Sequence, residues 1–251
     1  MSLRVMVLGA LGKVGSCLVR GVEQADDLVL AGAIDAGDDL AAAIEREHPQ
    51  VAIDFTTPDV VYDNVTLLLR SDVHAVVGTT GHTEQHLAEF DRLAREHEVG
   101  CMVAPNFALG AVLMMRFAEE AARHMPWVEI IERHHEHKLD APSGTARTTA
   151  ERIAAARKDA GVGSPHPERE SESAPGARGG RVDDVSVHSI RLPGSVAHQE
   201  VLFGGPGETL SIRHDTIDRE VFVPGVLLAV RGIGDQRGLV RGLEPILWPR
   251  T

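Results

Sequence analysis

The stretch "LRVMVLGALGKVG", residues 3–15, decides the fold class. Residues 3–8, apolar except for Arg4, have the length of a buried strand, and a helical pattern follows the glycines. A strand, a glycine turn and a helix in this order are typical of a loop that binds dinucleotide phosphates. We expect Gly9 to permit the tight turn, Gly12 to let the pyrophosphate approach the backbone, and Gly15 to pack the helix against the strand. The spacing G-x-x-G-x-x-G is looser than the G-x-G-x-x-G fingerprint, so the glycines alone are weak evidence.

An acidic residue ends the second predicted strand. The run "LVLAGAID", residues 28–35, stops at Asp35, which stands twenty positions after Gly15. A carboxylate there would accept hydrogen bonds from the adenosine ribose hydroxyls. A solvated turn acid is the simpler alternative, but a strand, glycines and an acid in this register together favour nucleotide binding.

Apolar strands and amphipathic helices continue to alternate as far as residue 107. This pattern predicts an α/β fold, a doubly wound Rossmann-type parallel sheet with helices on both faces. Ligands bind such sheets outside the carboxyl ends of the strands. Three segments should form that crevice: Phe55, Thr56 and Thr57; Gly78, Thr79, Thr80 and Gly81; and Ala104, Pro105, Asn106 and Phe107. The "GTTG" segment is also consistent with an ordinary turn and helix N-cap.

The second half of the chain has a different pattern. After a predicted helix, "WVEIIERHH" reads as a strand, residues 143–160 as a helix, and three further strand-like runs follow with short glycine-rich turns. This predicts a second α+β domain with a mixed or antiparallel sheet. Residues 159–184, rich in Gly, Pro, Ser and charge, should form a long, mobile surface loop.

The last apolar helix, "FVPGVLLAVRGI", needs a core to cover, and we expect the chain to return to the first domain there. The predicted organisation is therefore a dinucleotide-binding domain of residues 1–107 and 218–251. Residues 108–217 would form a substrate-binding and oligomerisation domain.

Composition excludes several classes of protein. A formal net charge of −12 argues against nucleic-acid binding, and no apolar run is long enough to span a bilayer. Cys17 and Cys101 cannot form a disulfide framework, so we expect reduced core cysteines in a cytoplasmic protein. An anionic ligand would need a local basic pocket to override the overall charge.

The stretch "ERHHEHKLDAPSGTA", residues 132–146, is a candidate for that pocket. In either a strand or a helix, His134 and Lys138 should project the same way, which pairs a titratable imidazole with an ammonium donor. Ser143 is a candidate N-cap, and the N–H groups of Gly144 and Thr145 would then hold a carboxylate. The spacing does not fit the His-Glu-x-x-His metal motif, so we expect no metal, although solvated histidines or a zinc site remain alternatives.

Several motifs resemble one family. "GALGKVG", "AVVGTTG", "APNFALGAVL", "ERHHEHKLDAPSGTA", "VAHQEVLFG" and "FVPGVLLAVR" are together similar to 4-hydroxy-tetrahydrodipicolinate reductases, also called dihydrodipicolinate reductases, and most to their actinobacterial branch. The resemblance runs from the first strand to the last helix. It implies nicotinamide-dependent reduction of a small cyclic dicarboxylate, after loss of water, to tetrahydrodipicolinate in bacterial diaminopimelate and lysine synthesis. It also implies a cytoplasmic homotetramer assembled through the sheets of the second domain.

The resemblance assigns roles to individual residues. His134 and Lys138 would be catalytic, and which of them delivers the proton stays open. The substrate would bind to His135, Ser143, Gly144 and Thr145. The cofactor would bind to Gly9, Ala10, Leu11, Gly12, Lys13, Val14, Gly15, Asp35, Phe55, Gly78, Thr79, Thr80, Gly81, Ala104, Pro105, Asn106 and Phe107.

Two departures from relatives bear on the cofactor. Some relatives place an arginine just after the ribose-binding acid, where this chain has Ala36, and others place a lysine where it has Leu11. Lys13 is then the only cation in the glycine loop. Because the Asp35 carboxylate would repel a 2′-phosphate, we expect NADH to be preferred and NADPH to be tolerated at best.

Other functions fit parts of the pattern. Another two-domain nicotinamide-dependent reductase of imine or carbonyl acids is the nearest, and a noncatalytic NADH-binding sensor is a second. A zinc protein built on the histidines is a third, and it would carry stoichiometric metal.

Overall fold

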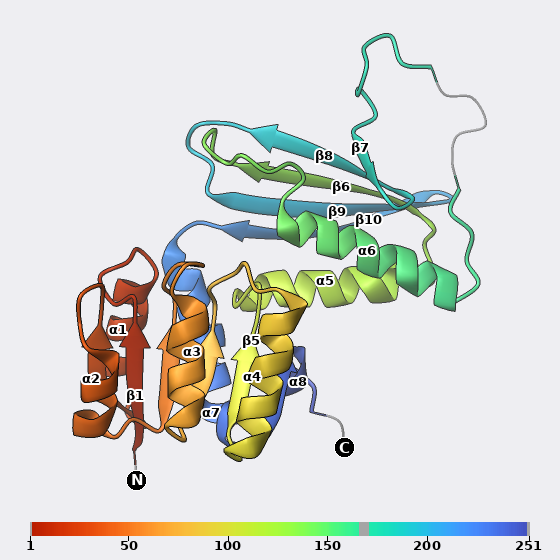
Figure 1. Ribbon diagram of the computed structural model, residues 1–251. Helices are drawn as coiled ribbons and strands as arrows, with labels where there is room; N and C mark the ends of the chain where they lie inside the picture. Colours follow the sequence, from red (N-terminus) through yellow and green to blue (C-terminus); the bar gives the residue numbers. More distant parts are fainter. Residues whose placement is uncertain (1, 166–170, 250–251) are drawn as a thin grey trace. The chain divides into compact units, whose positions relative to one another are not determined.

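The computed structural model describes residues 2–165 and 171–249. Contacts divide the chain into two compact units (Figure 1). The first unit comprises Met1–Leu109 and Arg219–Thr251, and the second comprises Gly110–Asp218.

A parallel sheet forms the centre of the first unit. Its described strands have the order β11-β5-β4-β3-β1-β2, and every neighbouring pair is parallel. The strands are β1 (Leu3–Leu8), β2 (Leu28–Ile34), β3 (Val51–Asp54), β4 (His74–Val77), β5 (Gly100–Val103) and β11 (Gly238–Arg241). This arrangement confirms the predicted doubly wound parallel sheet, to which β11 adds a strand that the sequence did not reveal.

Helices cover both faces of this sheet, which explains why its strands are mostly apolar rather than alternating between apolar and polar residues. In register, Met6, Ala52, Ala75 and Cys101 form a buried row on one face. That face packs against α2 (Leu40–Glu47), α3 (Val61–Arg70) and α4 (Glu84–Glu96), and α3 and α4 lie in front of the sheet in Figure 1. The opposite face is covered by α1 (Gly15–Glu23) and α7 (Val223–Gly232). The apolar last helix therefore returns to the first unit, as expected, and the short α8 (Glu244–Leu247) follows it.

The strands β1, β3, β4 and β5 end at the same level of the sheet. Leu8 pairs with Asp54, Asp54 with Val77, and Val77 with Val103. Because parallel strands end at a common edge, the loops that follow them open at the same edge of the sheet.

The second unit is built on a mixed sheet, which confirms the predicted sheet type. The strand order is β10-β9-β6-β8-β7; β6 and β8 are parallel, and the other neighbours are antiparallel. The elements are α5 (Leu109–Ala122), β6 (Trp127–His134), α6 (Gly144–Asp159), β7 (Gly180–Val182), β8 (Val185–Arg191), β9 (Ala197–Gly205) and β10 (Glu208–Thr216).

In its described part, the expected loop of residues 159–184 contains a strand, β7. β7 lies near its end and pairs with β8. Before β7, the Glu172 carboxylate accepts the N–H groups of Gly176 and Arg178, both at 3.0 Å. Residues 166–170 lie outside the described residues, so the predicted mobility stays a prediction.

The two faces of the second sheet differ. Ile130 is fully buried on the face that packs against α6. Side chains alternate along a strand, so Trp127 of β6 lies on the other face, as does Ile190 of β8, which pairs with Arg133. Trp127 and Ile190 are 46% and 42% exposed. This face of the isolated unit therefore presents large apolar side chains.

Candidate active site

A cavity of about 780 Å³ opens at the carboxyl edge of the first sheet. Its lining includes most of the segments that the sequence indicated. The lining residues are Leu8, Gly9, Gly12, Lys13, Val14, Ile34, Asp35, Ala36, Gly37, Asp38, Leu40, Phe55, Thr56, Thr57, Pro58, Val60, Asn64, Gly78, Thr79 and Thr80. The glycine loop, the acid at the end of β2 and two of the three predicted crevice loops thus meet in one place.

The glycine loop has no room for larger residues at its ends. Gly9 has φ +77°, and a Cβ there would lie 2.5 Å from the carbonyl oxygen of Phe55. A Cβ on Gly15 would overlap the carbonyl oxygen of Gly9. The absence of Cβ atoms thus permits the turn at Gly9 and the close packing of α1 on it.

The carboxylate of Asp35 is tied to the glycine loop. It accepts the Leu11 N–H at 2.7 Å and the Ala36 N–H at 2.8 Å. These backbone hydrogen bonds, that of Ala36 first, lower the pKa of Asp35, so it is ionised at neutral pH. Asp38, which also lines the cavity, accepts the Asp35 N–H at 2.8 Å. This end of the cavity therefore carries two acidic side chains.

A buried carboxylate that sequence reasoning missed holds two of the crevice loops. Asp54 is fully buried at the end of β3. Its Oδ1 accepts the Thr56 N–H at 3.1 Å, the Thr56 hydroxyl at 2.7 Å and the Thr79 hydroxyl at 2.9 Å. Its Oδ2 accepts the Asn64 amide at 3.0 Å. The sequence did offer one indication of this residue, an acid at the end of the apolar run "VAID".

Some predicted cofactor residues are not among those that line the cavity. They are Ala10, Leu11, Gly15, Gly81, Ala104, Pro105, Asn106 and Phe107. Leu11 directs an 86% exposed side chain into solvent and contributes only its N–H to Asp35. Phe107 is buried, and its ring centroid lies 5.8 Å from that of Phe55, which does line the cavity.

In the second unit, the catalytic candidate His134 ends β6 beside a buried acid. Glu132 is fully buried, and its Oε2 lies 2.6 Å from Nδ1 of His134. Arg191 donates to both oxygens of Glu132 at 2.9 Å, and the Ser143 N–H donates to Oε1 at 3.2 Å. Burial alone would raise the pKa of Glu132, but the hydrogen bonds from His134 and Arg191 outweigh it and lower the pKa to about 2.

The chain after His134 forms a turn rather than a strand or helix. The Lys138 N–H donates to the carbonyl oxygen of His135 at 3.2 Å, and His135 is exposed. The periodicity argument for His134 and Lys138 therefore does not apply, because neither a strand nor a helix extends from His134 to Lys138. The Lys138 ammonium instead donates to Asp140 at 2.8 Å.

Ser143 is the N-cap of α6, as the sequence predicted. Its hydroxyl accepts the Ala146 N–H at 3.2 Å, and the helix begins at Gly144. A Cβ on Gly144 would meet nothing within 4 Å, so the first turn is open at that position. The N-terminus of a sixteen-residue helix carries partial positive charge that favours an anion.

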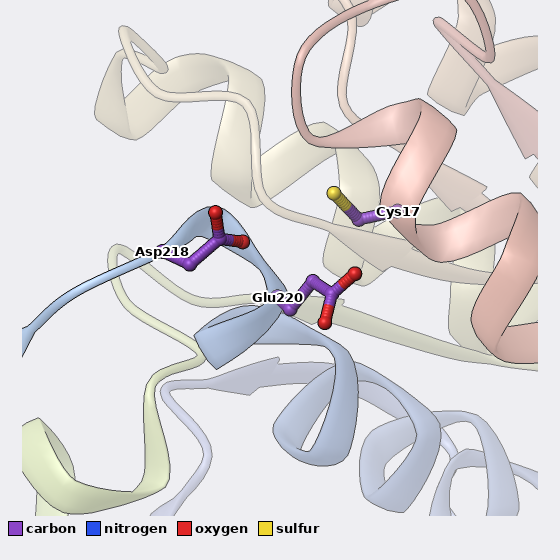
Figure 2. A group of neighbouring side chains, drawn as sticks. All are labelled: Cys17, Asp218 and Glu220. Carbon is purple, nitrogen blue, oxygen red and sulfur yellow. The ribbon is translucent and has the colours of Figure 1, made fainter.

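The histidine-rich stretch does not assemble as a metal site within residues 2–165 and 171–249. His134 uses Nδ1 for Glu132, and the rings of His135 and His137 are 6.2 Å apart. On the first unit, Figure 2 shows the side chains of Cys17 and Glu220, each of which accepts a hydrogen bond from Arg20, at 3.4 and 3.2 Å. The Arg20 guanidinium therefore donates hydrogen bonds to both the Cys17 thiol and the Glu220 carboxylate. Asp218, also drawn there, is the last residue of the second unit.

None of the helices in the described residues has the length and apolarity needed to cross a bilayer.

Comparisons with known proteins cover both units. The family profile described as dihydrodipicolinate reductase, N-terminus, matches residues 3–107, and the C-terminal profile matches residues 110–247. A protein named 4-hydroxy-tetrahydrodipicolinate reductase in Mycobacterium sp. (strain KMS) is 56% identical over 246 residues, which cover 98% of this chain and 99% of the relative. A namesake in Mycolicibacterium smegmatis is 53% identical over the same length.

Comparison with solved structures supports the same family and fold. The dipicolinate-bound dihydrodipicolinate reductase of Paenisporosarcina sp. TG-14 has a TM-score of 0.88 and 40% identity, and the match covers 98% of this chain and all of that one. An amine dehydrogenase from Mycobacterium smegmatis, at 11% identity and a TM-score of 0.62, shares the fold alone. The predicted family, fold class and oxidoreductase class are confirmed: the chain belongs to the dihydrodipicolinate reductase family.

Proposed function

We propose that this protein reduces 4-hydroxy-tetrahydrodipicolinate, through its dehydrated form, to tetrahydrodipicolinate in bacterial diaminopimelate and lysine biosynthesis. The observation that carries this proposal is the folded His134–Thr145 segment. It combines an imidazole held by a buried carboxylate, an ammonium and an open helix N-terminus on one unit. The names of full-length relatives, and the dipicolinate bound to one of them, support a small dicarboxylate as the substrate.

We assign the cofactor to the cavity of the first unit. The glycine loop fits a pyrophosphate because Gly12 lines the cavity and leaves its backbone accessible there. Asp35 would receive the ribose hydroxyls, and the Phe55 and Gly78–Thr80 segments would border the nicotinamide. The bound nicotinamide supplies a hydride. We propose that Lys13 and Val14, which also line the cavity, contact the cofactor, and that the predicted cofactor residues outside the lining hold these loops in place.

The residues of the second unit handle charge and protons. The N–H groups at the start of α6, from Gly144 and Thr145, would hold one substrate carboxylate. His134 would exchange a proton at the site, and Lys138 would donate a proton or stabilise developing negative charge. His135, exposed on the turn, would contact the substrate. Together these groups form the local basic pocket that an acidic chain needs for an anionic ligand.

The structure supports a preference for NADH. The ionised Asp35 and its neighbour Asp38 both line the cavity at the end where an adenosine 2′-phosphate would lie. Relatives with an arginine after this acid could neutralise such a phosphate, whereas this chain has Ala36. We therefore propose NADH as the preferred cofactor, with NADPH accepted less well.

We further propose a cytoplasmic homotetramer assembled through the second unit. The sheet face with exposed Trp127 and Ile190 offers apolar area that subunit contacts would cover. The free, buried Cys17 and Cys101 suit a reducing compartment. Light scattering should then give four times the chain mass of 27.0 kDa. A monomer mass would refute the assembly.

The function is tested by following NADH and NADPH oxidation side by side. The substrate is generated in situ from pyruvate and aspartate semialdehyde. Turnover with NADH is expected, and kcat/KM favouring NADPH tenfold or more, about 1.4 kcal/mol, would refute the stated preference. Binding of NADH without any turnover would favour the sensor, and equal turnover of monocarboxylated analogues would favour a different reductase.

A further inference from the structure

In the described part of the second unit, the carboxylate of Glu132 accepts hydrogen bonds from several groups. It is fully buried and accepts hydrogen bonds from Arg191, His134 and the backbone of Ser143, and the Ser189 hydroxyl also helps to lower its pKa. We propose that Glu132 is a positioning residue: its carboxylate fixes His134 as the Nδ1–H tautomer and leaves Nε2 as the nitrogen that exchanges protons. This inference rests on the proposed function, because it gives His134 its catalytic task.

The tautomer follows from the chemistry of the contact. With a pKa of about 2, Glu132 is an ionised carboxylate at neutral pH, and both of its oxygens can only accept. The 2.6 Å contact to His134 is therefore a hydrogen bond only if Nδ1 carries the proton. A neutral His134 must then have an unprotonated Nε2. The same carboxylate stabilises the imidazolium when Nε2 gains a proton.

Arg191 holds the Glu132 carboxylate in place, and each of its own N–H donors has an acceptor. Its Nε and Nη atoms carry five N–H donors. Two of these donate to Glu132, and the other three donate to the carbonyl oxygens of Lys138, Ile190 and Asp140. Arg191 is therefore a clamp on Glu132 and on the turn that carries Lys138, and it has no donor left for the substrate.

The hydrogen bond from Ser143 extends the role of Glu132 to the substrate cradle. Ser143 caps α6, and its N–H donates to Oε1 of Glu132, while His134 binds Oε2. One carboxylate thus fixes the proton-exchanging ring and the start of the helix proposed to bind the substrate carboxylate. A rotation of either group would break its hydrogen bond to a buried charge, which is costly.

A Glu132→Gln substitution should invert the tautomer. At the Oε1 position, the new NH₂ group would face two donors, from Arg191 and Ser143. At the Oε2 position it would face only one donor, from Arg191, and could donate to Nδ1 of His134. The Ser189 hydroxyl can donate or accept, so it does not decide the orientation. The amide should therefore place its NH₂ beside His134, which leaves Nδ1 unprotonated and Nε2 protonated.

The direct test is nitrogen NMR of protein labelled with ¹⁵N-histidine, in mildly alkaline buffer where neutral imidazoles predominate. The His134 signals are assigned by their absence from the His134→Ala spectrum. We expect a protonated Nδ1 in the wild-type protein and a protonated Nε2 in Glu132→Gln. A wild-type His134 with its proton on Nε2 would overturn the proposal, and that result does not depend on how well the variant folds.

The matched control is Glu129→Gln. Glu129 lies on the same strand, faces the other side of the sheet, and accepts from Nε2 of His188 at 2.7 Å and from Arg178. This variant removes an equivalent carboxylate from a histidine outside the proposed site. We expect its kcat to stay within about twofold of wild type, since it leaves the proton donor unchanged.

Kinetics separates positioning from folding. Glu132→Gln should lower kcat at least about tenfold, because a neutral amide no longer stabilises the imidazolium form of His134, while KM for NADH changes by less than about twofold. A wild-type kcat in this variant, or an unchanged His134 tautomer, would overturn the role of Glu132. Failure of the wild-type protein to reduce 4-hydroxy-tetrahydrodipicolinate would instead refute the proposed function, and the NMR result would still decide the tautomer.

Discussion

Removal of the Asp54 carboxylate should weaken cofactor binding, although this side chain is buried behind the loops that line the cavity. Asp54→Ala deletes the acceptor for Thr56, Thr79 and Asn64. A net hydrogen bond contributes about 1 kcal/mol, and four are lost. Because all three partners line the cavity, water can replace part of this loss. We therefore expect the free energy of unfolding to fall by about 2–4 kcal/mol.

The effect on binding follows from the position of these loops. Thr56 and Thr79 stand in the two segments proposed to border the nicotinamide, and both hydroxyls would lose their fixed orientation. We expect the Kd for NADH, measured by fluorescence titration, to rise at least tenfold, about 1.4 kcal/mol. Urea unfolding of the same samples measures the stability change.

The Asp54→Asn variant is the control for this reasoning. Its amide oxygen can occupy the Oδ1 position, which accepts three of the four hydrogen bonds. Its NH₂ group would then face Asn64, whose own amide can turn to present an oxygen. We expect a Kd for NADH within about threefold of wild type. A wild-type Kd in Asp54→Ala, or equal loss in both variants, would refute the role assigned to these hydrogen bonds.

Three further predictions concern individual residues. His134→Ala and Lys138→Ala should each lower kcat about 100-fold or more, and full activity in steady-state assays would remove that residue from the mechanism. Gly15→Ala should destabilise the first unit and impair NADH binding because its Cβ would overlap the Gly9 carbonyl, and an unchanged melting temperature would contradict this. Glu132 has a folded-state pKa of about 2 against an ordinary 4.5, so the unfolded chain takes up its proton first as the pH falls. Its contribution of at most about 3 kcal/mol should be complete above pH 4.5 and lost towards pH 2, and an equally steep acid loss in Glu132→Gln would refute it.

The first unit could be predicted well because its strands are buried on both faces. Each strand then reads as a short apolar run, and the helices between them have a clear polar face. β11 was missed because Gly238–Arg241 is four residues long and ends in an arginine. Its assignment to the sheet comes from pairing with β5, which lies more than a hundred residues earlier.

The second unit was less predictable in its details. The antiparallel strands were visible from their short turns, but the three-residue β7 was hidden in a loop of mixed composition. The end of β6 was also hidden, because "RHHEHK" has no apolar positions whose period could mark where the strand stops. The motif thus indicated which residues matter, while the turn that places Lys138 required the structure.

Asp54 and Glu132 show why the supporting residues of a site are harder to predict than the residues it exposes. Both acids lie at or near the end of a strand that packs in the core, where an unpaired charge would cost several kcal/mol. Their donors come from up to 59 positions away in the chain, so no local spacing reveals them. An acid within a buried strand therefore implies that the fold brings donors to it. In this protein those donors belong to the loops and to the histidine that the proposed chemistry uses.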